Sequence, residues 1–205
     1  MMPQTGLQKS RLLLGGLLVL SAIPILVSMV RLAQIPLGNL PPESQRFAEV
    51  PVAHLAHALA GALFGLIGPV QFSNALRRRF GGVHSVLGRV FVAAGLLLVV
   101  SALRLLWEFP TFVIWQLTLT RLIVAVGMGI ALVWAVLAAQ RGDKAQHRSW
   151  MIRAYALGMG AATQAVVMLP IAAASGAALH GPVTDWIFIG TWVFNLWLAE
   201  WIIRR

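Results

Sequence analysis

Six long apolar stretches follow one another along the chain, separated by short segments that hold most of the polar residues. A helix needs about 20 apolar residues to cross the roughly 30 Å hydrocarbon layer of a bilayer, and lipid offers no partner to an open backbone group, so each stretch is expected to be helical. The expected spans lie at about residues 12–30, 52–75, 86–106, 117–139, 150–174 and 186–203. The pattern predicts an all-α fold, a polytopic membrane helical bundle of six transmembrane helices that forms a single integral membrane domain over residues 1–205.

The composition is typical of a membrane protein. Hydrophobic residues make up 59% of the 205 residues and charged residues 11%, whereas a soluble domain carries about 25% charged residues. The net charge of +10 does not indicate nucleic acid here, because the basic residues lie in short turns between apolar stretches. The chain has no cysteine, which excludes disulfides and thiolate ligands. The first stretch is long enough to span, and we expect it to be retained rather than cleaved as a signal peptide.

The basic residues predict the orientation of the bundle. With the N-terminus inside, 12 Lys and Arg lie at inside ends of the spans and 4 at outside ends. The inside set is Lys9, Arg11, Arg77, Arg78, Arg79, Arg89, Arg141, Lys144, Arg148, Arg153, Arg204 and Arg205. The outside set is Arg31, Arg46, Arg104 and Arg121. Because basic residues accumulate on the cytoplasmic side, we expect an N-in/C-in, multi-pass protein of the inner (cytoplasmic) membrane.

Two basic turns each place a histidine at the start of an apolar stretch. One turn, residues 77–84, ends in His84, and the other, residues 141–148, contains His147. If their helices are neighbours, the two imidazoles could ligate one haem iron, because a bis-His haem b needs no cysteine. The arginines available for its propionates are Arg77, Arg78, Arg79, Arg89, Arg148 and Arg153. The simpler interpretation is that these turns bind anionic lipid headgroups, at about 1 kcal/mol per basic residue.

His54 and His57 lie three residues apart in the second stretch, about one helical turn inside the outer surface. A histidine at that depth needs a hydrogen-bond partner or faces a cavity. His57 is therefore either a cofactor-binding candidate or a hydrogen-bonded core residue.

Small residues predict which helices pack closely, because small side chains let helices approach each other in lipid. They gather in the second and fifth stretches, at Gly61, Gly65, Gly158 and Ala162, so we expect these two helices to touch through these residues. Arg153 and Glu200 share a depth near the inner ends of the fifth and sixth stretches. Pairing between them would offset the cost of taking both charges out of water.

Several segments together resemble one known family. They are His57-Ala58-Leu59-Ala60-Gly61, Gly68-Pro69-Val70-Gln71-Phe72, the positions Arg77, His84, Gly88 and Arg89, and His147-Arg148-Ser149-Trp150-Met151-Ile152-Arg153-Ala154-Tyr155-Ala156-Leu157. Over roughly residues 54–170 the chain resembles the bacterial predicted membrane proteins of the domain of unknown function 2306 family. The resemblance implies a multi-span membrane protein of unassigned activity. It selects His57, Gln71, Arg77, His84, Arg89, His147, Arg148, Trp150 and Arg153 as family-pattern positions. The chain departs from the pattern near Gln164, where the family commonly carries an arginine.

Two functional hypotheses follow. The first is a non-catalytic accessory or lipid- or partner-binding membrane protein, whose basic turns meet anionic headgroups or a neighbouring membrane protein. The alternative is a haem-b electron carrier acting with a quinone. In it His84 and His147 hold the iron, and the further cofactor-binding candidates are His57, Arg89, Arg148 and Arg153. The sequence has no nucleotide-binding loop, zinc motif or catalytic triad, so it leaves open whether the protein is an enzyme.

Overall fold

The computed structural model describes residues 4–109, 114–176 and 181–205, apart from the side chains of residues 4–13 and 43. Within these ranges the chain is helical and has no strand. The elements are α1 (Gln4–Leu37), the 3₁₀ helix η1 (Pro42–Ala48), α2 (Pro51–Gln71), α3 (Asn74–Arg79), α4 (Gly81–Glu108), α5 (Trp115–Gln140), α6 (Lys144–Gly158), α7 (Gly160–Ser175) and α8 (Pro182–Ile203). The predicted all-α bundle is confirmed.

All six predicted spans correspond to helices. In the described part of the chain, α1 from Leu14 onward, α2, α4, α5 and α8 are each long and apolar enough to cross a membrane. The helices α6 and α7 pass the same test only together, as a bent pair that would make a sixth span. The expectation of one continuous helix over 150–174 is wrong, because α6 and α7 meet at an angle of 40° at Met159.

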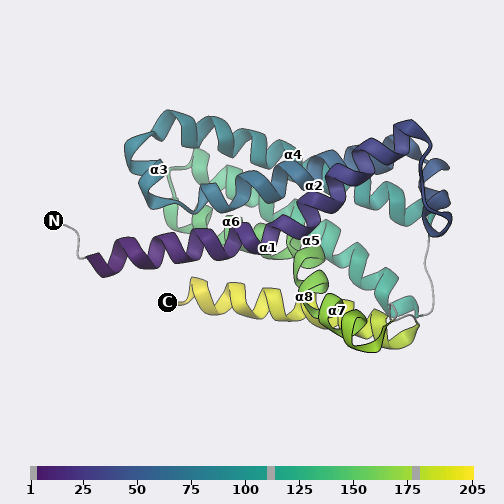
Figure 1. Cartoon of the computed structure of the whole chain (residues 1–205). Helices are drawn as coiled ribbons and strands as arrows, with labels where there is room; N and C mark the ends of the chain where they lie inside the picture. The colour runs from purple at the N-terminus through teal and green to yellow at the C-terminus, as the bar shows by residue number, and fades with distance from the viewer. Residues whose placement is uncertain (1–3, 110–113, 177–180) are drawn as a thin grey trace.

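The spans run up and down, and both chain ends lie at the same end of the bundle (Figure 1). We call this the terminal end; α3 and the turn between α5 and α6 also lie there. We call the opposite end, with η1 and the start of α8, the loop end. Both basic turns therefore share an end with both termini, as the predicted orientation requires.

An aromatic core lies between α2, α4 and α6. The rings of Phe64 and Phe91 stack with their centroids 4.3 Å apart, and Tyr155 stacks on Phe64 at 5.8 Å. Small residues bring the helices together around these rings; Ala60, Ala154 and Ala162 are fully buried. In lipid this close van der Waals packing is the main force between helices.

Glycine positions show which helices meet. A Cβ on Gly158 of α6 would lie 2.5 Å from Cε1 of Phe64 of α2, and a Cβ on Gly68 of α2 would collide with the Tyr155 ring of α6. The second and fifth spans therefore touch, as predicted. The predicted role of Gly61 and Gly65 is wrong, since both face α1: their added Cβ atoms would lie 3.5 Å from Ser28 Oγ and 3.1 Å from Ile25 Cγ1.

The break at Met159 is stabilised by side chains from α8. The amide of Asn195 donates to the carbonyl of Ala156 at 3.1 Å, and the indole N–H of Trp192 donates to the carbonyl of Leu157 at 3.2 Å. The last carbonyls of a helix have no partner within it, and lipid supplies none. The two α8 side chains therefore allow an irregular turn at membrane depth.

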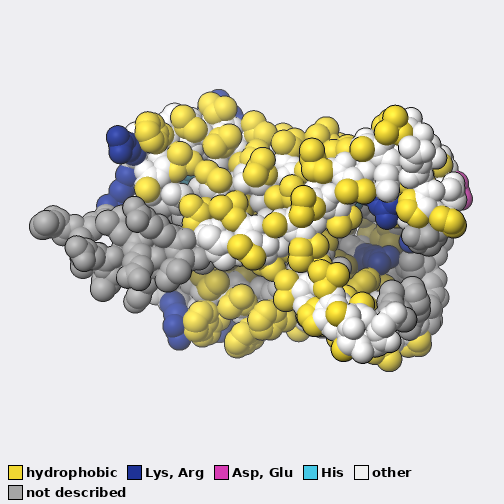
Figure 2. All heavy atoms as spheres, viewed as in Figure 1, with side chains coloured by type: hydrophobic (Ala, Val, Ile, Leu, Met, Phe, Trp, Pro, Cys, Tyr) yellow, Lys and Arg dark blue, Asp and Glu magenta, His cyan; other side chains and the backbone are white. Residues whose placement is uncertain are grey.

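The visible outer surface of the bundle is largely apolar, and Lys and Arg side chains gather at its terminal end (Figure 2). Large exposed apolar side chains occur on several spans, for example Val19, Ile123 and Val193. Exposed apolar surface of this extent indicates contact with lipid or with another protein. It matches the membrane bundle that the sequence predicts.

Candidate functional site

A cavity of about 410 Å³ lies inside the bundle toward the loop end. Small-molecule sites are typically about 300–1,000 Å³, so this volume is sufficient for a ligand. Every span contributes to the walls, which are mostly apolar, and its polar lining side chains are Ser28, Arg46, His54, His57, Arg121 and Gln164. Figure 2 shows a hollow between α1 and α7 with Lys or Arg side chains inside it. Because α1 is long and apolar enough to span a membrane and α7 belongs to the bent pair, this opening lies between segments that we expect in the bilayer.

His57 lines the cavity and is hydrogen-bonded to α4. Its Nδ1 lies 3.1 Å from Ser101 Oγ, and the Ser101 hydroxyl donates to the carbonyl of Leu97 at 2.7 Å. A hydroxyl has one proton, so His57 Nδ1 is the donor and its Nε2 keeps a lone pair. Ser101 cannot act as a nucleophile activated by His57 in this geometry, because its proton already goes to the backbone.

His54 and Arg46 lie at the loop-end part of the cavity. The imidazole of His54 packs between Phe47 and Phe109, with ring centroids 4.4 and 5.7 Å away. Its Nδ1 lies 3.2 Å from the carbonyl of Val50, and that nitrogen is therefore the donor. The guanidinium of Arg46 stands 5.6 Å from the centre of the Phe47 ring. Aromatic rings thus hold both side chains at the cavity.

Arg121 contributes a positive charge from α5, within a membrane span. It interacts electrostatically with Asp185 of α8 and with Arg46. The Asp185 carboxylate also accepts a hydrogen bond from the backbone N–H of Ile114 at 3.3 Å, and it does not line the cavity. An ionisable residue within a membrane span is costly unless it is paired or faces a cavity, and such residues often mark functional sites.

Gln164 and the broken helix form another side of the cavity. Gly158, Met159 and Ala161 of the break line it together with Gln164. The Gln164 side-chain nitrogen is buried and has no hydrogen-bond partner among the described residues. An unpartnered donor next to a cavity in lipid calls for an acceptor. Discontinuous helices often form binding sites in membrane proteins, because their polar backbone can line a cavity.

A second polar cluster lies at the terminal end. His147 Nδ1 lies 2.8 Å from the carbonyl of Ala135 of α5, and His147 and Arg77 both act electrostatically on His84. Gln71 reaches α4 one turn after His84, since its Oε1 lies 3.4 Å from where a Cβ on Gly88 would stand. His84 Nδ1 and Gln71 Nε2 are buried without partners among the described residues. His84 and His147 are therefore close enough to interact electrostatically.

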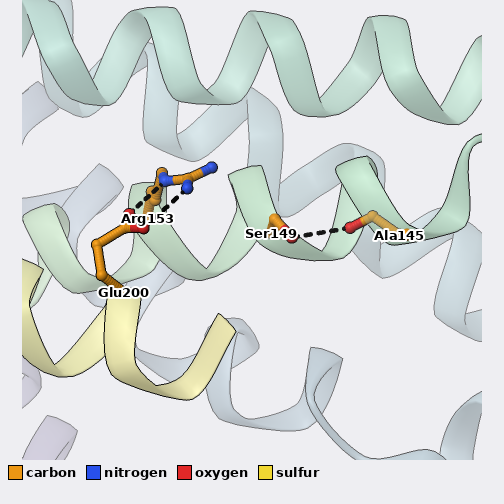
Figure 3. A network of polar contacts seen from close by, with 4 residues as sticks. All are labelled: Ala145, Ser149, Arg153 and Glu200. Atoms are coloured by element: carbon orange, nitrogen blue, oxygen red, sulfur yellow. Dashed lines mark hydrogen bonds and ion pairs between the residues drawn. The ribbon is translucent and has the colours of Figure 1, made fainter. Parts of the chain in front are cut away.

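The other predicted site residues are Arg89, Arg148, Arg153 and His57, and their surroundings differ from those of His84 and His147. Arg89 and Arg148 are exposed. Arg153 binds Glu200 through two hydrogen bonds, Nε to Oε1 at 2.6 Å and Nη2 to Oε2 at 3.0 Å (Figure 3). Its guanidinium carbon lies 4.7 Å from the centre of the Trp150 ring. The proposed pairing of Arg153 with Glu200 is therefore present, and His57 belongs to the cavity instead.

The haem hypothesis gains no support from this geometry. The described residues contain no group of three or more His, Asp or Glu side chains that could hold a metal ion. Neither His84 nor His147 lines the 410 Å³ cavity. Arg153, expected at a propionate, has its guanidinium on Glu200 instead.

The sequence did not predict that these residues line one cavity. Arg121 was counted only among the basic residues at the outside ends, and Gln164 was noted only as a departure from the family pattern, although each is a polar residue inside an apolar stretch. That feature is itself a signal of a functional site. Gly158 and Gly160 on either side of Met159 were a further signal, since closely spaced glycines favour a kink.

The comparisons with known proteins match the chain to a family. The family described as "Predicted membrane protein (DUF2306)" matches residues 54–203, which include most of α2 and all of the helices from α3 to α8. No curated protein and no solved structure matches the chain.

Proposed function

Since this chain belongs to the DUF2306 family of predicted membrane proteins, we propose that it is a membrane protein that binds an amphiphilic small molecule taken from the bilayer. One observation carries the proposal: a 410 Å³ cavity that is apolar over most of its wall and has two arginines, two histidines and a glutamine among its lining residues. Apolar walls favour a hydrocarbon body, and the polar residues favour a polar head.

The proposed role is binding rather than chemistry. His57 donates to Ser101, whose proton is held by the Leu97 carbonyl, and no described acidic residue lines the cavity to orient a catalytic base. The lateral opening between α1 and α7 supports delivery of the ligand from within the bilayer. The ligand would then lie with its head toward the loop end and its chain among the apolar side chains.

The membrane placement is part of the same proposal. We infer that residues 1–205 act as one membrane domain in the inner membrane, with the terminal end in the cytoplasm. The basic turns at that end would then meet anionic headgroups, each basic residue contributing about 1 kcal/mol. A membrane-protein partner at the exposed apolar surface is compatible with this arrangement.

Filling the cavity tests the proposal. Ala161 of α7 is exposed and lines the cavity, whereas Ala93 of α4 is exposed and does not. The purified protein in phosphatidylcholine nanodiscs would be tested with a fluorescent single-chain amphiphile. We expect Ala161→Phe to weaken binding by about tenfold or more, equivalent to about 1.4 kcal/mol, and Ala93→Phe to leave it unchanged. Unaltered binding by Ala161→Phe would rule out this cavity as the site.

A further inference from the structure

We infer that the ligand of this cavity carries a negatively charged head, a carboxylate or a phosphate, at the end of a single hydrocarbon chain. The inference rests on the proposed function and names the ligand class of the same site. A volume of 410 Å³ is near the lower end of the range for small-molecule sites, which favours one chain over the two chains of a phospholipid.

The charges around the cavity favour an anion. Its described lining residues include Arg46 and Arg121 and no Asp or Glu. Asp185 acts on Arg121 from outside the described lining. Charge interactions are stronger in a cavity away from water than at an exposed surface. An anionic head would offset part of the cost of holding two guanidinium groups there.

The hydrogen-bonding groups favour an acceptor-rich head. The indole N–H of Trp192 is used by the Leu157 carbonyl and the Nδ1–H of His57 by Ser101, so neither serves a ligand. The buried side-chain nitrogen of Gln164 has no partner among the described residues. Carboxylate and phosphate oxygens accept several hydrogen bonds each, and they bind guanidinium groups more strongly than a neutral oxygen does. A neutral amphiphile could accept from Gln164 but would bind the guanidinium groups less strongly than an anion does.

Three ligands that have the same hydrocarbon chain but different head groups test which head group the cavity binds. Tritiated palmitate, hexadecyl phosphate and hexadecanol would each be bound to the full-length protein in phosphatidylcholine nanodiscs, with empty nanodiscs as background. We expect at least one anionic ligand to bind about tenfold or more tighter than hexadecanol. The preferred anion identifies the head as carboxylate or phosphate.

Two substitutions, one removing a positive charge and one removing a negative charge, test whether electrostatics cause the preference for an anion. Arg121→Gln should weaken binding of the preferred anion to the level of hexadecanol. Asp185→Asn should tighten it, because the negative charge beside Arg121 is removed while an amide oxygen can still accept from Ile114. Hexadecanol binding should not respond to either change. Arg104→Gln is the control, since Arg104 pairs with Glu108 and does not line the cavity. Loss of folding cannot imitate the gain expected for Asp185→Asn.

The outcomes separate the inference from the proposed function. If hexadecanol binds as tightly as the anions and neither charge substitution matters, the cavity binds amphiphiles but the inferred anionic head is wrong. If none of the three ligands binds above empty nanodiscs, the proposed function fails with it.

Discussion

Arg153 and Glu200 join α6 to α8 by a two-point pair, with Nε 2.6 Å from Oε1 and Nη2 3.0 Å from Oε2 (Figure 3). The two side chains are 26% and 36% exposed, so the pair is neither at the open surface nor fully buried. It lies on the same helix pair that Asn195 and Trp192 connect at the break. Three polar contacts therefore fix α8 against α6.

Breaking this pair should destabilise the bundle measurably. Exposed pairs contribute about 0.2–1 kcal/mol, and removing one partner of a buried pair costs about 3–5 kcal/mol. We expect Glu200→Gln to cost about 1–3 kcal/mol in the free energy of unfolding, measured by denaturation in mixed micelles. Arg153→Lys should cost nearly as much, because an ammonium cannot reproduce the two parallel hydrogen bonds.

The pair between Arg104 and Glu108 is the matched control. It lies within one helix at i,i+4, and Arg104 is half exposed, so Glu108→Gln should change stability by about 0.5 kcal/mol or less. Equal effects of Glu200→Gln and Glu108→Gln would show that the α6–α8 pair contributes no more than a surface pair.

Glycines in contact with aromatic rings should respond differently from glycines in open space. A Cβ on Gly158 would meet Phe64 Cε1 at 2.5 Å, whereas one on Gly190 of α8 would meet nothing within 4 Å. We expect Gly158→Ala to cost about 1–3 kcal/mol through overpacking, and Gly190→Ala to be neutral or stabilising by up to about 1 kcal/mol through helix propensity. The same unfolding assay compares them. A neutral Gly158→Ala would mean that Phe64 moves aside at little cost.

The sequence predicted the spans well, because hydrophobic length is a local property that lipid enforces on each stretch. It did not predict the break at Met159, since the groups that stabilise it, Trp192 and Asn195, lie more than 30 residues further along the chain. The cavity was missed for the same reason. Arg121 and Gln164 are on different helices, and only the packing of the bundle brings them to one space.

Helix contacts were predicted in part. The stripe of small residues identified α2 and α6 as neighbours but could not say which glycine faces which helix. Gly61 and Gly65 face α1, whereas Gly68 faces Tyr155 of α6. A row of small residues shows which face of a helix is closely packed. Which helix packs against that face depends on the arrangement of the whole bundle.

Reporter fusions should place the two ends of the bundle on opposite sides of the membrane. Gly142 lies in the turn between α5 and α6 at the terminal end, and Gly181 directly precedes α8 at the loop end. From the excess of basic residues at the terminal end we expect alkaline phosphatase to be active only when fused at Gly181, and green fluorescent protein to fluoresce only at Gly142. The reverse pattern would invert the proposed orientation, and the same side for both would contradict the six-span arrangement.

The helix break should depend on Asn195, whose side-chain amide both donates and accepts a hydrogen bond. Its nitrogen donates to the Ala156 carbonyl at 3.1 Å, and its oxygen accepts from the Thr163 hydroxyl at 2.9 Å, so one side chain ties α8 to both halves of the broken span. Asn195→Leu keeps similar bulk but leaves the carbonyl and the hydroxyl without these contacts in an environment that offers few others. We expect a loss of about 1–3 kcal/mol in the free energy of unfolding. The double variant Asn195→Leu with Thr163→Val removes both partners of one contact, so its loss should be smaller than the sum of the two single losses. Strictly additive losses would show that the two residues do not interact across the break.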